Sequence, residues 1–129
     1  VLEFYEQLKE QLVKLDMHED FALRYLNEGF SGGEKKRMEM LQLSILKPKY
    51  AILDEIDSGT DVGAMKLIAE QLKQLVKKEN IGLILVSHYQ KFLHYLKPDR
   101  VYIIKEGTII KEGDATLIDE IEKKGFDNL

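Results

Sequence analysis

The fold is set by the stretch Tyr50-Ala51-Ile52-Leu53-Asp54-Glu55, in which a short apolar run precedes two acids. A continuous apolar run of this length is typical of a strand that is buried on both faces. Ligands of parallel α/β sheets bind at the carboxyl ends of the strands, where Asp54 and Glu55 would lie. Asp54 is suited to hold Mg²⁺, usually through water, and Glu55 could orient or deprotonate an attacking water. The alternative is a pair of solvated acids that cap the next turn.

The apolar periodicity on both sides of this stretch indicates alternating helices and strands. This order predicts an α/β fold with a mostly parallel sheet and crossover helices, to which a terminal hairpin adds strands at one side. We expect one domain over 1–129, with a helical segment at 1–47 and a sheet segment at 48–129. The predicted helices are 2–15, 19–26, 31–47, 61–78, 89–96 and one that begins at Asp114 or Thr116 and runs through Lys124, and the predicted strands are 50–53, 81–86 (also buried on both faces), 100–105 and 108–111.

Ser31-Gly32-Gly33-Glu34 opens the third predicted helix. Ser31 is a good N-cap and Glu34 stands at the third helical position, so the two predict a capping box. The glycines let backbone amides approach an anion closely, and the helix end carries partial positive charge. The alternative is a glycine-rich turn with a serine cap. We expect the buried stripe of this helix to be Met38, Leu41, Ile45 and Leu46.

Val86-Ser87-His88 ends the second predicted buried strand. A histidine in this position can donate a hydrogen bond to a transferring phosphoryl group or position a water molecule. The alternative is a structural histidine that caps the following helix. We assign that structural role to His18 and His94, since neither has an acid or a cysteine at ligand spacing in the sequence.

Ser58-Gly59-Thr60-Asp61 connects the acid pair to the next helix, which Asp61 could cap. Its functional interpretation is a contact segment across a dimer interface. Lys35, Lys36 and Arg37 form a basic triplet in the first turns of the helix that follows Ser31. Such a triplet is usually a solvated face, but we also consider that Lys36 pairs with Glu55 at rest and holds it inactive.

Composition excludes several classes of protein. The chain has 129 residues, 23 acidic and 19 basic, and its net charge of −4 argues against nucleic acid as the main partner. No cysteine is present, so a thiolate metal site and disulfides are excluded. The apolar stretches are too short to span a bilayer, and we expect no direct insertion into a membrane.

These motifs together resemble an ABC-type ATPase: Ser31–Glu34 resembles its signature loop, Tyr50–Glu55 its Walker B strand, Ser58–Asp61 its D-loop and His88 its switch histidine. The chain contains no G-x-x-x-x-G-K-[ST] motif, so the resemblance implies the C-terminal part of a P-loop ABC ATPase domain that lacks Walker A. More narrowly, the runs 27–37, 53–59, 87–90 and 95–101 resemble SufC, the ATPase of the Suf iron–sulfur cluster assembly system. Ile56 and Thr60 depart from the residues usual in that family.

The resemblance implies a mechanism and partners. ATP and Mg²⁺ would be the cofactors, and two copies would pair head to tail as a homodimer. Asp54, Glu55 and His88 would serve the chain's own site, and Ser31 to Glu34 would serve the ATP of the partner subunit. Asp61 would contribute to nucleotide binding as part of the D-loop.

The attached scaffold would be of the SufB and SufD type, in the bacterial cytoplasm or in a plastid or apicoplast. This piece alone would be inactive. Two alternatives remain open: the nucleotide-binding domain of an ABC transporter, and a non-catalytic docking fragment.

Overall fold

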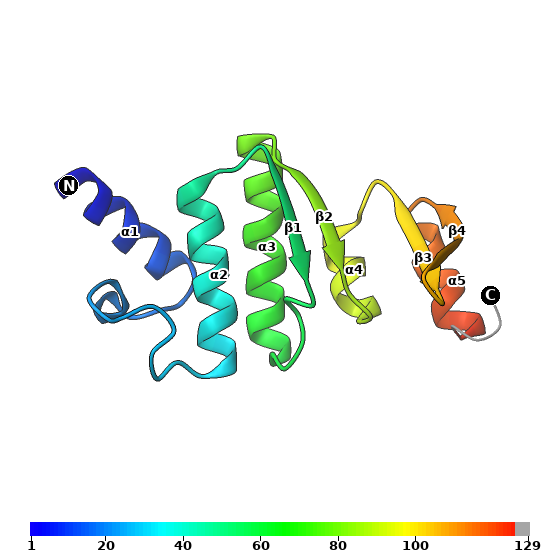
Figure 1. The fold of residues 1–129 in the computed structure, drawn as a ribbon, viewed down its shortest axis with the longest axis horizontal. Coiled ribbons are helices and arrows are strands. Elements are labelled where there is room, and N and C mark those ends of the chain that lie inside the picture. The colour runs from blue at the N-terminus through cyan, green and yellow to red at the C-terminus, as the bar shows by residue number, and fades with distance from the viewer. Residues whose placement is uncertain (126–129) are drawn as a thin grey trace. The chain divides into compact units, whose positions relative to one another are not determined.

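The computed structural model describes residues 1–125, which divide into two compact units after Ser87 (Figure 1). The first unit contains α1 (Leu2–Lys14), the 3₁₀ helix η1 (Glu19–Ala22), α2 (Gly32–Leu46), β1 (Tyr50–Asp54), α3 (Val62–Glu79) and β2 (Gly82–Val86). The second contains α4 (Gln90–Leu96), β3 (Val101–Lys105), β4 (Thr108–Gly113) and α5 (Thr116–Lys124). No helix within 1–125 is long and apolar enough to cross a membrane.

The helix predicted over 19–26 is shorter in the structure, where η1 covers only Glu19–Ala22. Asn27 and Gly29 adopt left-handed backbone angles, with φ of 62° and 68°, which a helix cannot continue through. The turn they form brings the ring of Phe30 against Phe21, edge to face at 4.9 Å between centroids. The guanidinium of Arg24 lies against both rings, at 4.9 and 5.2 Å. This cluster fixes the chain just before Ser31.

Helix α2 packs against α1 on one side and α3 on the other (Figure 1). Met40 and Leu43 are therefore buried together with Met38 and Leu41. The predicted stripe was wrong at its end, because Leu46 is 74% exposed. A helix with neighbours on two sides buries more than one stripe, so the period of a single face does not describe α2.

Strands β1 and β2 are parallel neighbours, in a register that runs from Tyr50 opposite Gly82 to Asp54 opposite Val86, with α3 as the crossover. Burial on both faces was wrong for both strands. Ala51 is buried, but Tyr50, Ile52 and Ile84 are 73%, 71% and 61% exposed. The cause is that helices of this unit cover only one face among the described residues, so alternate side chains are left uncovered.

The second unit folds around its own hairpin. Glu106 and Gly107 both have positive φ, 49° and 75°, as a two-residue primed turn requires. Strands β3 and β4 form a separate two-stranded antiparallel sheet within 1–125, so the expectation that they extend the parallel sheet was wrong. The two strands of the hairpin pair with each other, and the hairpin packs against α5. Ile103, Leu117 and Ile118 are buried.

The predicted division at residue 48 lies within the first compact unit, since α2 and β1 both belong to it. The division into a helical segment, 1–47, and a sheet segment, 48–129, therefore stays a prediction. The other predicted elements agree with the structure to within one or two residues at most ends.

Candidate functional site

The acid pair lies at the carboxyl end of β1. Asp54 is the last residue of the strand and lies opposite Val86 of β2. Glu55 follows directly, and its backbone N–H donates to the carbonyl of Val86 at 2.8 Å. Both acids are exposed, so their carboxylates are accessible from solvent at the edge where ligands of parallel sheets bind.

Glu55 occupies a left-handed backbone conformation, with φ of 47°. Its carbonyl oxygen accepts the N–H of Ser58 at 3.0 Å, which closes the turn after the strand. The same oxygen accepts a hydrogen bond from Nζ of Lys36 at 3.0 Å. A side chain near the start of α2 is thereby joined to the residue that follows β1. The contact that joins Lys36 to Glu55 is thus a hydrogen bond to the backbone, and the pairing of their charges that the sequence suggested stays a prediction.

The start of α2 is a complete capping box, as predicted. The hydroxyl of Ser31 accepts the N–H of Glu34 at 3.3 Å, and the carboxylate of Glu34 accepts the N–H of Ser31 at 2.7 Å. These bonds, with the backbone N–H of Ser31 as the main cause, hold the pKa of Glu34 below its ordinary value. A Cβ at Gly32 or Gly33 would meet nothing within 4 Å. Both glycines therefore border open space at the start of the helix, an end that favours anions.

Asp61 caps α3, and its carboxylate accepts the N–H of Ala64 at 2.9 Å. Bonds from the N–H groups of Ala64 and then Gly63 lower its pKa. In Figure 1 α2 and α3 begin at the lower end of the first unit, and β1 and β2 both run toward that end. The residues before α2 and α3 and those after β1 therefore lie toward the same end of this unit.

Sequence reasoning missed Asp57, which is only 5% exposed. Its Oδ2 accepts the hydroxyl of Ser87 at 2.8 Å, and its carbonyl accepts the hydroxyl of Thr60 at 2.7 Å. Its Oδ1 is buried and has no hydrogen-bond partner among the described residues. Asp57 thus joins the end of β2 to the turn that carries Glu55 and leads to Asp61. The signal in the sequence that could have identified Asp57 is an acid two residues after Glu55.

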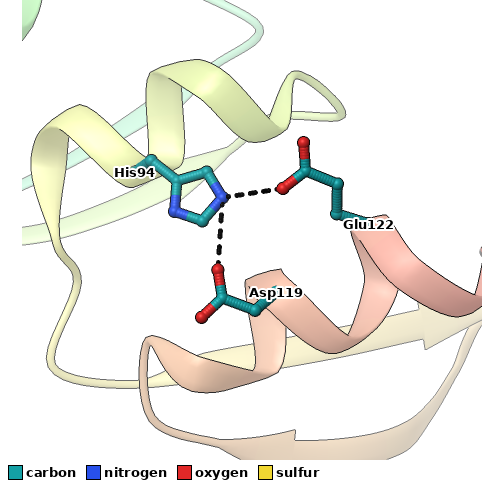
Figure 2. A group of neighbouring side chains, drawn as sticks. All are labelled: His94, Asp119 and Glu122. Carbon is teal, nitrogen blue, oxygen red and sulfur yellow. Dashed lines mark hydrogen bonds and ion pairs between the residues drawn. The ribbon is translucent and has the colours of Figure 1, made fainter.

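His88 is the first residue of the second unit and is exposed. Its grouping with Asp54 and Glu55 stays a prediction. The structural role assigned to His94 was incomplete, since acids lie near it in space. Its Nε2 is 3.6 Å from Asp119 and 3.3 Å from Glu122, both on α5 (Figure 2). His18 makes a local pair with Asp20 at 3.0 Å.

Comparison with solved structures identifies the class of fold. The chain superimposes on the dimeric structure of MJ0796, a bacterial ABC transporter cassette, with a TM-score of 0.72 and 21% identity, over 85% of this chain and 46% of that one. It also matches a bacterial Atm1-family ABC exporter with ATP bound, with a TM-score of 0.70 and 18% identity, over 93% of this chain and 22% of that one. The fold is that of the C-terminal part of an ABC ATPase domain.

Curated relatives agree with this class. The chain is 47% identical over 126 residues to a probable ABC transporter ATP-binding protein of Streptococcus pyogenes, covering 98% of this chain and 49% of the relative. It is 44% identical over 127 residues to vegetative protein 296 of Bacillus subtilis, covering 98% and 48%. It is 51% identical over 128 residues to the probable ATP-dependent transporter ycf16 of Cyanophora paradoxa, covering 98% and 48%. The chain spans about half the length of these relatives. It matches no protein-family model.

Proposed function

We propose that the chain is the C-terminal part of an ATP-hydrolysing subunit. The observation that carries this proposal is the turn after β1. There two exposed acids end a parallel strand, and Lys36 of α2 binds the carbonyl of Glu55 at 3.0 Å. The fold shared with ABC cassettes and the 47% identity to an ABC transporter ATP-binding protein support it.

In this proposal each acid has a separate role. Asp54 would hold Mg²⁺, because its exposed carboxylate offers the oxygen ligands that a hard cation prefers at the sheet edge where nucleotide phosphates bind. When bound there, the ion would neutralise charge on the phosphates. Glu55 orients or deprotonates the attacking water, and His88 donates a hydrogen bond to the transferring phosphoryl group.

The nucleotide sites of this proposal form between two copies. The start of α2 binds the ATP of the partner subunit through Ser31, Gly32, Gly33 and Glu34. Asp61, at the start of α3, contributes to nucleotide binding. The open space beside Gly32 and Gly33 supports the role of α2, since no neighbouring group crowds these two residues of the helix start. The solved cassette of similar fold is itself described as dimeric.

The narrower proposal is a SufC-type subunit of iron–sulfur cluster assembly, attached to SufB- and SufD-type scaffolds in the bacterial cytoplasm or in a plastid or apicoplast. The runs 27–37 and 53–59 support it by their resemblance to SufC. The names of the relatives favour the second candidate, the nucleotide-binding domain of an ABC transporter. Purification of the full-length protein separates the two: a scaffold pair accompanies it in the first case and a membrane-spanning partner in the second.

The direct test is Glu55→Gln in the full-length protein. The amide keeps the size of the side chain but cannot take a proton, so ATP hydrolysis should fall by more than about a hundredfold while ATP binding is kept. Glu39→Gln, on the exposed side of α2, is the matched control and should hydrolyse ATP normally. Normal hydrolysis by Glu55→Gln would exclude its proposed role.

The 129-residue chain alone should hydrolyse ATP negligibly, because it lacks the glycine-rich lysine loop that cradles phosphates. Turnover at the rate of the full-length protein would contradict this. Direct ATP binding by the 129-residue chain would separate this proposal from the non-catalytic docking alternative.

A further inference from the structure

The second unit holds a cluster of three side chains, from two helices, of the types that can ligate a metal ion. His94 lies on α4, and Asp119 and Glu122 lie on α5, which packs against α4. Figure 2 shows both carboxylates turned toward the same ring nitrogen, Nε2 of His94. One ligand atom from each residue lies within 4.8 Å of the other two.

Hydrogen bonding accounts for only one of the two contacts. Nε2 bonds to Glu122 Oε2 at 3.3 Å, whereas Asp119 Oδ1, at 3.6 Å, is too distant for a good N–H···O bond. A single ring proton cannot satisfy two carboxylates at once. Asp119 and Glu122 are also three residues apart on one helix face, where like charges repel. A protonated imidazole offers one positive charge against two negative ones.

A divalent cation fits the same three atoms better. With metal–ligand distances of about 2.0–2.2 Å, a tetrahedral ion places its ligand atoms roughly 3.3–3.6 Å apart, which is the spacing of Nε2 from both oxygens. The two carboxylates are half exposed and can rotate to close the remaining distance between them. The dication balances both acids, and three protein ligands leave one position for water.

We propose that His94, Asp119 and Glu122 bind a divalent transition-metal ion, and that this ion joins α4 to α5. One imidazole nitrogen and two carboxylate oxygens form a donor set that suits Zn²⁺. Both helices belong to one compact unit, so the ion acts as a cross-link within the second unit. This site is independent of the nucleotide site proposed above, because it uses none of the same residues.

The test is a calorimetric zinc titration of the full-length protein and of variants. His94→Ala should lower the affinity of this site by at least about tenfold, and the isosteric Asp119→Asn and Glu122→Gln should do the same, since each removes one of three ligands. His18→Ala is the matched control, because His18 is an exposed histidine that pairs with a single acid, Asp20. Circular dichroism of each variant checks that it is folded.

A second measurement separates ligation from mere packing. Zinc should raise the midpoint of thermal unfolding of the wild-type protein and of His18→Ala, but not of the Asp119→Asn, Glu122→Gln double variant. The proposal is overturned if folded His94→Ala binds zinc with wild-type affinity and stoichiometry. It is also overturned if the wild-type protein binds no zinc at submillimolar concentrations.

Discussion

At the scale of single residues, the conformation of Glu55 is the most informative feature. A residue with a side chain in the left-handed region costs roughly 1–3 kcal/mol relative to ordinary backbone. Glycine would avoid this cost, yet the position with φ of 47° holds a glutamate. The N–H of Glu55 bonds to Val86 and its carbonyl to Ser58 and Lys36, and these three bonds hold the residue in place. The carboxylate is thus presented from a backbone that its neighbours fix.

The ion pairs of Glu120 predict how the stability of the fold depends on pH. Bonds from the ammonium groups of Lys111 and then Lys124 lower the pKa of Glu120 from 4.5 to about 2. A lowered pKa in the folded state means that Glu120 stabilises the fold above about pH 4.5 and that this contribution is lost as the pH falls toward about 2. Glu120→Gln should therefore reduce the free energy of unfolding at pH 7, and the deficit should vanish near pH 2.

Denaturant unfolding between pH 7 and pH 2 measures this deficit. Glu112→Gln, an exposed acid on β4, is the control and should leave the pH dependence close to that of the wild type. A Glu120→Gln deficit that stays constant down to pH 2 would contradict the ion-pair account.

Residue-scale features were predictable where their causes are local. The capping box of Ser31 and Glu34 spans three positions, so the sequence pattern contained both partners. The partners of Asp57 and His94 lie 30 and 28 residues away, at Ser87 and Glu122. Sequence periodicity does not predict contacts between residues this far apart in the chain, because these atoms come together only when the chain folds.

At the scale of elements, the bond between Asp57 and Ser87 ties β2 to the turn after β1. Ser87→Ala removes the hydroxyl that donates to Oδ2 and leaves a buried carboxylate without this partner. The free energy of unfolding should fall by about 1–3 kcal/mol. Urea unfolding of the full-length protein checks this, with Ser58→Ala as the control in the same turn. Equal stabilities of the two variants would show that the bond contributes nothing.

The hydrogen bond from Lys36 of α2 to the carbonyl of Glu55 leads to a separate prediction about ATP hydrolysis. Lys36→Ala frees the turn after β1 from α2, so the resting ATP hydrolysis rate of the full-length protein should rise by about two- to fivefold. Lys35→Ala changes a neighbouring exposed lysine and should leave the rate unchanged. An unchanged rate in Lys36→Ala would count against the idea that this contact restrains Glu55.

Elements themselves were predictable, but their burial was not. The apolar runs correctly indicated β1 and β2, because a strand's position follows from its own residues. The number of faces that are covered depends on distant segments, and Tyr50, Ile52 and Ile84 are exposed on the uncovered face. The hairpin was also found from Glu106-Gly107, because both residues of its turn adopt the positive φ that such a turn requires.

At the scale of the whole molecule, the central claim is that each nucleotide site forms between two copies. Glu55 would serve its own copy and Gly33 the partner's. Gly33→Asp should keep the fold, since a Cβ at Gly33 meets nothing within 4 Å and an acid in the first turn suits a helix start. Its carboxylate would repel a phosphate. Homodimers of Gly33→Asp and of Glu55→Gln should therefore both be inactive.

Mixing these two inactive full-length variants tests the claim most directly. In a head-to-tail pair, one site receives both defects and the other receives neither, so an equal mixture should regain about a quarter of the wild-type ATP hydrolysis rate. If each site lies within one copy, every site carries a defect. The mixture would then stay as inactive as its two components, and that result would contradict the account.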